Sequence, residues 1–346
     1  MQAAVYRGKE SISIEEVADP KLAAGELLIE VEACTVCGVD LRTYRHGDAK
    51  ITPPRILGHE FSGRVAASTA PDAGVALGDR VVMYIVIACN RCVYCQDGRA
   101  NLCVQRTTMS YHHDGAFARY VRIPAAAVAA RQVYCVPEAI APEHAALCEP
   151  LGCVLNAHGR LNVGFRDTVV VIGAGPIGVM HALAARLRGA RQVIMVETSP
   201  ERLEMAKRFP IDAVVHNDGS GGHLAEVQRL TNGMGPSVVI VACGVAQAQA
   251  DALEMAGKGG RVEFFGGLPK TKPFATLNTN HLHYKELLIS GSYSEKRSDF
   301  EAAMALIFSG RFPAAEVVTT KLPLARLCEA FPLMEQGGAL KVSISP

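Results

Sequence analysis

The pattern of apolar and polar positions divides the chain into two kinds of region. Through residues 1–150, short apolar runs such as 27–32 and 81–87 alternate with Pro, Gly and Cys, which predicts strands joined by turns. From about residue 149 the pattern changes to strand, helix, strand, helix. It predicts buried strands at 168–172, 192–196, 237–241 and 260–265, helices at 177–188, 201–209, 246–256 and 299–309, and a last strand at 339–344. This alternation is typical of an α/β domain with a parallel sheet covered on both faces.

Length and composition describe a globular protein of two domains. The chain has 346 residues, 49% hydrophobic and 20% charged, with a net charge of +1 and no basic run, so we expect no nucleic-acid partner. No apolar run approaches the ~18 residues that a membrane span needs. The first residues show no export segment, so we expect a cytoplasmic protein whose cysteines are reduced or metal-bound.

Four of the eleven cysteines lie close together in the sequence. They are Cys89, Cys92, Cys95 and Cys103. Spacers of two residues let a looping backbone turn successive sulfurs toward one point, so this set predicts a closed tetrahedral Zn²⁺ shell with a structural role. The alternatives are ordinary buried thiols or disulfides, and neither requires this spacing.

A glycine-rich turn follows the strand predicted at 168–172. Gly173, Gly175 and Gly178, with Pro176 and Ile177 between them, stand where a strand gives way to a helix, and Glu197 ends the next strand. This pattern predicts a dinucleotide site with the pyrophosphate at the helix N-terminus and the adenosine ribose on Glu197. A carboxylate there repels a 2′-phosphate, so NAD is expected rather than NADP. Arg202 is a further candidate for the ribose.

Three separated segments supply a second set of metal-ligating residue types. Cys37 offers a thiolate, His59 an imidazole, and Glu60 and Glu149 carboxylates. This mixture suits Zn²⁺, and three protein ligands with one exchangeable position define a catalytic site. Each residue taken singly could be an ordinary core or surface residue, so only the combination indicates a site.

These motifs, in this order, resemble the zinc-dependent medium-chain dehydrogenases, and most of all their polyol (sorbitol or L-iditol) and threonine dehydrogenase branch. The resemblance covers the whole chain. It implies a GroES-like β-rich catalytic domain at 1–150, completed by 288–346, and a doubly wound Rossmann domain at 151–287. It also implies two zinc ions per chain, NAD, a small alcohol substrate and a homodimer or homotetramer. Cys37 and His59 should bind the catalytic zinc, while Glu60 and Glu149 compete for the third position.

Two residues depart from the resembling family. Val39 stands where a hydroxyl usually begins a proton relay, and Arg42 where a threonine dehydrogenase would show histidine. Because valine cannot carry a proton, we expect Glu60, Glu149 or His46 to take it. Thr43, Tyr44 and Arg45 are candidates for substrate contact, in what we interpret as a loop.

The expected reaction is hydride transfer between a secondary alcohol of a polyol and NAD. Alternative substrates are a cyclitol, an amino alcohol such as L-threonine, or a simple secondary alcohol. Val39 also permits a chain that has kept zinc and NAD but lost turnover. A zinc-free quinone reductase fits poorly, because it would need neither cysteine-containing set.

Overall fold

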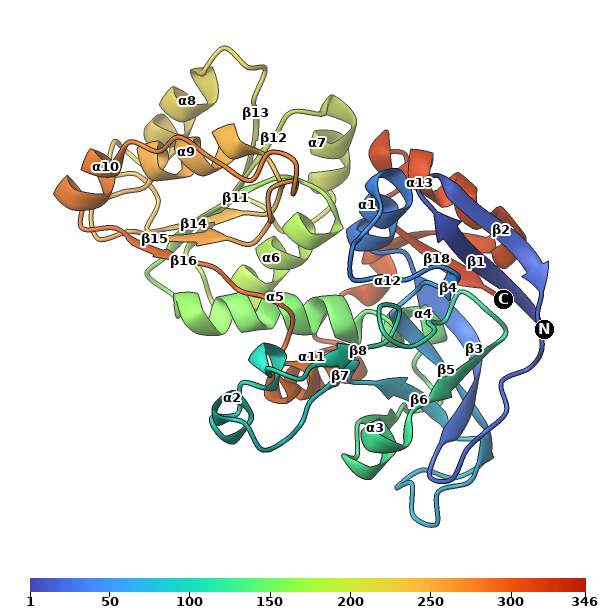
Figure 1. The fold of residues 1–346 in the computed structure, drawn as a ribbon. Helices are drawn as coiled ribbons and strands as arrows, with labels where there is room; N and C mark the ends of the chain where they lie inside the picture. Colours follow the sequence, from blue (N-terminus) through green and yellow to red (C-terminus); the bar gives the residue numbers. More distant parts are fainter. The chain divides into compact units, whose positions relative to one another are not determined.

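A computed structural model describes all residues from 1 to 346. The chain forms two compact units (Figure 1). Unit 1 comprises Met1–Gly152 and Glu295–Pro346, and unit 2 comprises Cys153–Ser294. No helix combines the length and the apolar character that crossing a bilayer requires.

Unit 1 is built mainly from antiparallel strands. Its seven-stranded sheet has the order β10-β6-β5-β3-β18-β17, with β9 also paired to β3, and smaller groups are β2-β1-β4 and β7-β8. The strands are β1 (Gln2–Gly8), β2 (Ser11–Glu16), β3 (Leu27–Thr35), β4 (Arg55–Ile56), β5 (Glu60–Ser68), β6 (Arg80–Met83), β7 (Val86–Ile87), β8 (Thr107–Thr108), β9 (Tyr120–Ile123), β10 (Val133–Cys135), β17 (Val318–Pro323) and β18 (Lys341–Ser345). Residues from both ends of the chain share this sheet, because β18 pairs with β3.

Short helices connect these strands and close the core of unit 1. They are α1 (Gly38–His46), α2 (Val93–Gln96), α3 (Ala125–Ala129), α4 (Pro142–Ala145), α11 (Arg297–Phe308), α12 (Ala314–Val317) and α13 (Leu327–Glu335). The core beneath them joins side chains from distant segments, such as Leu27, Phe117 and Phe331, all essentially inaccessible to solvent.

The strand predicted at 81–87 is two strands in the structure. The chain leaves the large sheet after Met83 and resumes at Val86 beside β8. In the gap the side-chain amide of Gln132 donates to the carbonyls of Tyr84 and Val86 at 3.2 and 2.5 Å. An unbroken apolar run carried no signal for this change of sheet, because both strands are buried.

Unit 2 is a six-stranded parallel sheet with helices on both faces (Figure 1). The strand order is β13-β12-β11-β14-β15-β16, and every adjacent pair is parallel. The strands are β11 (Thr168–Ile172), β12 (Gln192–Glu197), β13 (Ala213–His216), β14 (Val238–Val241), β15 (Arg261–Phe264) and β16 (Leu288–Ser290). The helices are α5 (Cys148–Leu161, which begins in unit 1), α6 (Pro176–Leu187), α7 (Pro200–Ala206), α8 (Gly222–Leu230), α9 (Ala246–Met255) and α10 (Thr279–Tyr284).

The four predicted strands of this sheet are confirmed, since the fully buried run at 168–172 and its neighbours have the continuous apolar character of parallel strands. The helix predicted at 201–209 ends at Ala206. Pro210 disfavours helical backbone at the residue before it, and the chain turns through 207–209. The sequence pattern missed β13, α8 and β16, which are short or partly exposed.

Candidate active site

Cys37, His59 and Glu60 meet in unit 1 because two of its strands pair antiparallel. Thr35 at the end of β3 lies opposite Glu60 at the start of β5, so the residues that flank this pair are neighbours. The metal-ligating atoms of the three side chains all lie within 4.8 Å of one another. His59 and Glu60 are buried, at 5% and 0% exposure. Segments over twenty residues apart in the chain thus form one cluster.

Asp40 is hydrogen-bonded to the turn that carries Cys37, and it faces the imidazole of His59. Its carboxylate accepts a hydrogen bond from the backbone N–H of Cys37 at 2.9 Å, as in a capping box of helix α1, and its other oxygen faces His59 Nδ1 at 3.6 Å. At this distance Nδ1 makes no hydrogen bond, so the ring is held by packing and by the attraction of Asp40. Burial lowers the pKa of His59, but Asp40, Glu149 and Glu60 outweigh it and raise the pKa overall. Asp40 had no predicted role, because the usual capping-box signal is Ser or Thr followed three residues later by Glu or Gln, and Cys37-x-x-Asp40 departs from it.

Glu60 forms a buried ion pair with a residue near the end of the chain. Lys341 Nζ lies 2.8 and 2.6 Å from the two oxygens of Glu60, and Thr35 Oγ1 also donates to this carboxylate. Lys341 is 2% exposed and Glu60 0%. Burial lowers the pKa of Lys341, but Glu60 and Cys37 outweigh this effect and raise the pKa overall. The lysine therefore stays protonated. Lys341 had no predicted role, because no local pattern marks a lysine that reaches its partner across a sheet.

Glu149 and Glu295 form a second acidic group in the same unit. A carboxylate oxygen of each lies within 4.8 Å of the other, and they are 8% and 0% exposed. Gly152 makes this approach easier, because a Cβ there would lie 3.3 Å from the Glu295 side chain. Burial raises the pKa of Glu149 well above its ordinary value, and Glu295 adds to the rise while His59 opposes it. Glu295 also had no predicted role, since its partner Glu149 lies far away in the sequence.

The charges around Cys37 fit a divalent cation. Three carboxylates, those of Asp40, Glu60 and Glu149, interact with Cys37 and His59. Lys341 of β18 is the cation that interacts with these carboxylates. Burial and Glu60 raise the pKa of the Cys37 thiol far above its ordinary value, so thiolate formation requires further positive charge. A thiolate, an imidazole and a carboxylate are donors that Zn²⁺ accepts.

The candidate substrate residues lie on a helix, so the interpretation of 43–45 as a loop is wrong. Helix α1 runs from Gly38 to His46 with Val39 in its first turn and His46 as its last residue. Thr43 is 1% exposed and its hydroxyl has no hydrogen bond. Tyr44 stacks on Phe331 with ring centroids 4.8 Å apart, and Arg45 pairs with Glu335 at 2.6 Å. Both side chains therefore hold α1 against α13.

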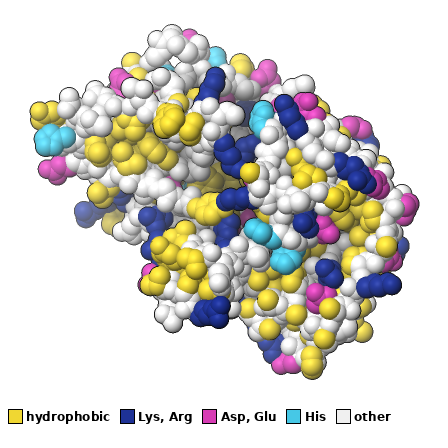
Figure 2. Space-filling model, viewed as in Figure 1, with side chains coloured by type: hydrophobic (Ala, Val, Ile, Leu, Met, Phe, Trp, Pro, Cys, Tyr) yellow, Lys and Arg dark blue, Asp and Glu magenta, His cyan; other side chains and the backbone are white.

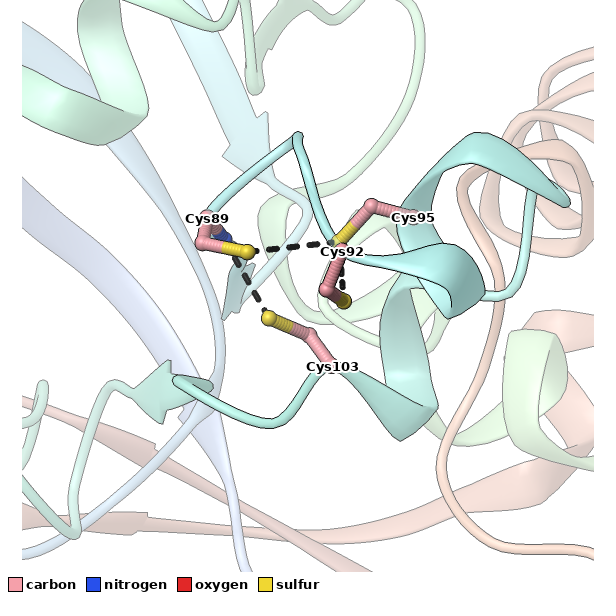
Figure 3. Close-up of side chains that lie close together, drawn as sticks. All are labelled: Cys89, Cys92, Cys95 and Cys103. Carbon is pink, nitrogen blue, oxygen red and sulfur yellow. Dashed lines mark hydrogen bonds between the residues drawn. The ribbon is translucent and has the colours of Figure 1, made fainter.

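The four-cysteine cluster is assembled from neighbouring turns of one segment (Figure 3). Sγ of Cys89 lies 4.0 Å from Sγ of Cys95, which lies 3.5 Å from Sγ of Cys92. Cys103 Sγ accepts hydrogen bonds from the backbone N–H groups of Cys89 and Gln105, at 3.2 and 3.3 Å. Backbone N–H groups at Val104 and Cys95 lower the pKa of Cys92 to about 6. Four converging sulfurs with a thiolate already favoured fit Zn²⁺, and none forms a disulfide.

The glycine-rich turn of unit 2 joins β11 to α6. Gly173 has φ +106°, and a Cβ at Gly178 would lie 1.8 Å from the Gly173 carbonyl oxygen, so both positions require glycine. A Cβ at Gly175 would meet no atom within 4 Å, which leaves open space above the helix N-terminus. Pro176 and Ile177 are the first two residues of α6.

Glu197 ends β12 and is tied to this turn. Its carboxylate accepts hydrogen bonds from the backbone N–H groups of Ala174 at 2.7 Å, Thr198 at 2.7 Å and Ser199 at 3.0 Å. Burial raises the pKa of Glu197, but these N–H groups outweigh it and the pKa falls below its ordinary value. Arg202 lies in the first turn of α7, where its backbone N–H donates to Ser199 Oγ.

Comparisons with known proteins agree with the two-unit fold and the candidate zinc and dinucleotide sites. Residues 23–133 match the GroES-like domain of alcohol dehydrogenases, and residues 176–309 match the zinc-binding dehydrogenase domain. An erythritol/L-threitol dehydrogenase of Mycolicibacterium smegmatis is 33% identical over 364 residues, covering 100% of this chain and 98% of that protein. The chain belongs to the zinc-type alcohol dehydrogenase family.

Other relatives in this family differ in the substrate they are named for. An L-threonine 3-dehydrogenase of Bacillus licheniformis is 31% identical to this chain. The match covers 98% of this chain and 96% of that protein. Among solved structures, an alcohol dehydrogenase from Escherichia coli in complex with NADH is 27% identical with a TM-score of 0.89, and the match covers 100% of this chain and 99% of that one. Family membership therefore establishes the class of enzyme and the α/β fold with its GroES-like and Rossmann parts, while the substrate needs a further argument.

Proposed function

We propose that this protein is an NAD-dependent zinc dehydrogenase that oxidises a secondary alcohol of a polyol. The observation that carries the proposal is the convergence of Cys37, His59 and Glu60 within 4.8 Å in a buried, acidic setting. Bound Zn²⁺ would supply a Lewis acid for the alcohol oxygen, and NAD⁺ would accept the hydride. The residues of this chain would hold these groups in place and move the proton.

The three converging residues are the proposed ligands of the catalytic zinc. Glu60 keeps its contacts with Lys341 and Thr35 in this assignment, because each carboxylate oxygen has a second lone pair. Cys89, Cys92, Cys95 and Cys103 would hold the structural zinc. Zinc analysis of Glu60→Gln and Glu149→Gln distinguishes the two carboxylates: the first variant should lose about one zinc per chain and the second none.

Glu149 is the proposed proton acceptor in place of the hydroxyl that Val39 lacks. Its carboxylate interacts with His59, and burial with Glu295 raises its pKa, which makes it a stronger base than an exposed carboxylate. Glu149→Gln should lower kcat by about 100-fold with zinc content unchanged. Unchanged turnover and pH dependence in this variant would move the role to His46, the second candidate.

The proposed cofactor is NAD, bound by Gly173, Gly175, Pro176, Ile177, Gly178 and Glu197, with Arg202 as a further ribose contact. Support comes from the ionised carboxylate of Glu197 at the end of β12, where it would repel a 2′-phosphate. Glu197→Ala should narrow the preference for NAD over NADP, measured as the ratio of kcat/KM values for the two cofactors.

A polyol is favoured over threonine by Arg42, which replaces the histidine expected in a threonine dehydrogenase, and by the erythritol/L-threitol relative. The test is an assay of NADH formation with hexitols, tetritols, pentitols, cyclitols, L-threonine and simple secondary alcohols. Oxidation of threonine alone would overturn the polyol assignment. Two bound zinc ions without turnover on any alcohol would favour a binding protein that has lost activity.

The protein is also proposed to form a homodimer or homotetramer through unit 2. The edge strand β16 exposes Leu288 at 68%, and Tyr284 and Phe274 nearby in the chain are 74% and 87% exposed. Figure 2 shows hydrophobic side chains gathered on the surface around α10. Light scattering after size-exclusion chromatography should give a mass above that of one chain, and Leu288→Lys should lower it.

A further inference from the structure

Unit 1 contains a cavity that the proposed reaction does not use. Its volume is about 430 Å³, within the range of small-molecule sites. Val5 of β1, Val17, Ile56 of β4 and Pro124 give it an apolar wall. None of the candidate zinc ligands lines it.

The polar part of the lining carries more positive than negative groups. Arg55 and Arg122 are the two cationic side chains, and Asp114 is the one carboxylate among the lining residues. Asp114 is already engaged, since its Oδ1 accepts hydrogen bonds from Arg55 Nη1 at 3.1 Å and from the Ile56 backbone N–H at 3.2 Å. Arg122 is half-exposed; its Nη1 pairs with Glu26 at 3.7 Å and donates to the Lys21 carbonyl at 3.4 Å, and no such contact involves its Nε or Nη2. Arg122 therefore retains donors for a ligand.

Two adjacent histidines belong to the same wall, and of these His113 already contacts Thr107 Oγ1 through Nε2 at 3.2 Å. The Thr108 backbone N–H donates to Nδ1 of His112 at 3.2 Å, so the neutral ring carries its proton on Nε2. Burial lowers the pKa of His113, His112, Arg55 and Arg122 lower it further, and Asp114 opposes them, so the cationic groups of the lining outweigh its one carboxylate at this ring. In a surrounding of this sign an anion is attracted.

The cavity wall is connected to the candidate metal site through two short segments. Tyr111, next to His112, faces His59 with ring centroids 6.4 Å apart. Gly115 N–H donates to the Ile56 carbonyl at 2.7 Å, and Ala116 N–H to the Gly58 carbonyl at 2.9 Å. Ile56 and Asp114 line the cavity and are hydrogen-bonded to each other, and the residues that follow them, Gly58 and Ala116, continue this pairing up to His59.

We propose that this cavity binds a small organic anion, a carboxylate or phosphate ester with an apolar body, and that its occupancy modulates catalysis at the zinc site. The anionic group would lie on Arg122 and His112, and the apolar body against Val17 and Ile56. The modulation, but not the binding, rests on the proposed function.

Calorimetric titration of the zinc-loaded protein with phenyl phosphate and with benzoate tests the binding and distinguishes the two anion types. Arg122→Gln should weaken the binding of the tighter-binding anion by about tenfold, because one charge-assisted contact is lost. Ala18→Phe, which fills the cavity and leaves both arginines in place, should weaken it as well. Arg119→Gln removes an exposed arginine just before β9 that lies outside the cavity, and should change nothing.

Anions also bind at dinucleotide sites, so the titration is repeated with saturating NAD. Binding that survives NAD and falls in Arg122→Gln and Ala18→Phe supports the cavity. Binding that NAD abolishes, or that neither variant weakens, overturns it, as does the absence of binding by either anion. With an alcohol substrate, the anion should change kcat or KM at least twofold in the parent and in Arg119→Gln, and not in Arg122→Gln. Binding without this kinetic change overturns the modulation alone.

Discussion

Two clusters of metal-ligating side chains in unit 1 are built in opposite ways. The cysteine cluster comes from one segment, 89–103; its backbone N–H groups lower the pKa of Cys92 to about 6, although burial raises that of Cys95 to about 12. The cluster of Cys37, His59 and Glu60 is assembled by strand pairing, and burial raises the pKa of its thiol. The first is prepared locally for a metal, whereas the second depends on the fold and on compensating charges. Ligand loss should therefore affect stability in the first and activity in the second.

The largest effect is expected from His59→Ala. Removing one ligand of the assembled cluster should lower kcat by about 1,000-fold or more, because a Lewis acid contributes several kcal/mol to such a step. Bound zinc should fall from about two to about one per chain. The thermal unfolding midpoint should change little, since strands β3 and β5 pair without the imidazole. Activity retained with one zinc would contradict the assignment of the catalytic site.

Cys92→Ser should have the opposite profile. Losing a ligand of the local cluster removes the metal that orders 89–103, and we expect the free energy of unfolding to fall by about 3 kcal/mol or more. Chemical denaturation followed by circular dichroism measures this loss. Cys328→Ser is the matched control, because Cys328 is an exposed thiol outside both clusters and its replacement should leave zinc content and stability unchanged.

Lys341→Met tests whether the assembled cluster depends on its compensating cation. Leaving Glu60 buried without the lysine should cost about 3–5 kcal/mol of stability in the zinc-free protein. The double variant Lys341→Met/Glu60→Gln should recover much of this loss, because it removes the uncompensated charge. Equal destabilisation of single and double variants would show that packing, and not charge, is responsible.

The smallest effect concerns unit 2, which buries ionisable groups in their neutral form. His158 and His181 stack with ring centroids 5.3 Å apart, are both 0% exposed, and form no hydrogen bonds through their ring nitrogens. Burial, with a smaller effect from Arg188, lowers the pKa of His158 to about 3, and burial lowers that of His181 well below its ordinary value.

In the unfolded chain both imidazoles regain a pKa of about 6.5 and bind protons that the folded chain excludes. Their stabilisation is therefore complete above pH 6.5 and is lost as the pH falls below it, by about 2 kcal/mol per imidazole at pH 5. Measured between pH 7 and pH 5, the fall in unfolding free energy should be about 2 kcal/mol smaller in His158→Phe than in the parent. His283→Gln, at an exposed position on α10, should behave as the parent does.

Comparing prediction with structure separates local from long-range information. The parallel strands of unit 2, the glycine turn and the four-cysteine spacing were predicted because each depends on neighbouring residues: buried runs, positive φ and short spacers. The helical state of 43–45 was missed because the segment Gly38–His46 is polar and lacks the apolar stripe that marks most helices. The break in the strand at 81–87 was missed because both halves are equally apolar.

The sequence by itself determined which residues could bind zinc and a dinucleotide, since the chemistry of a thiol, an imidazole or a glycine turn is carried by residue type and spacing. Only the tertiary structure decided that Asp40 faces His59, that Lys341 compensates Glu60, and that Glu295 lies beside Glu149. The physical reason is that these partners come from strands and helices up to 281 residues apart. Their distances are set by sheet register and core packing, which no local pattern encodes.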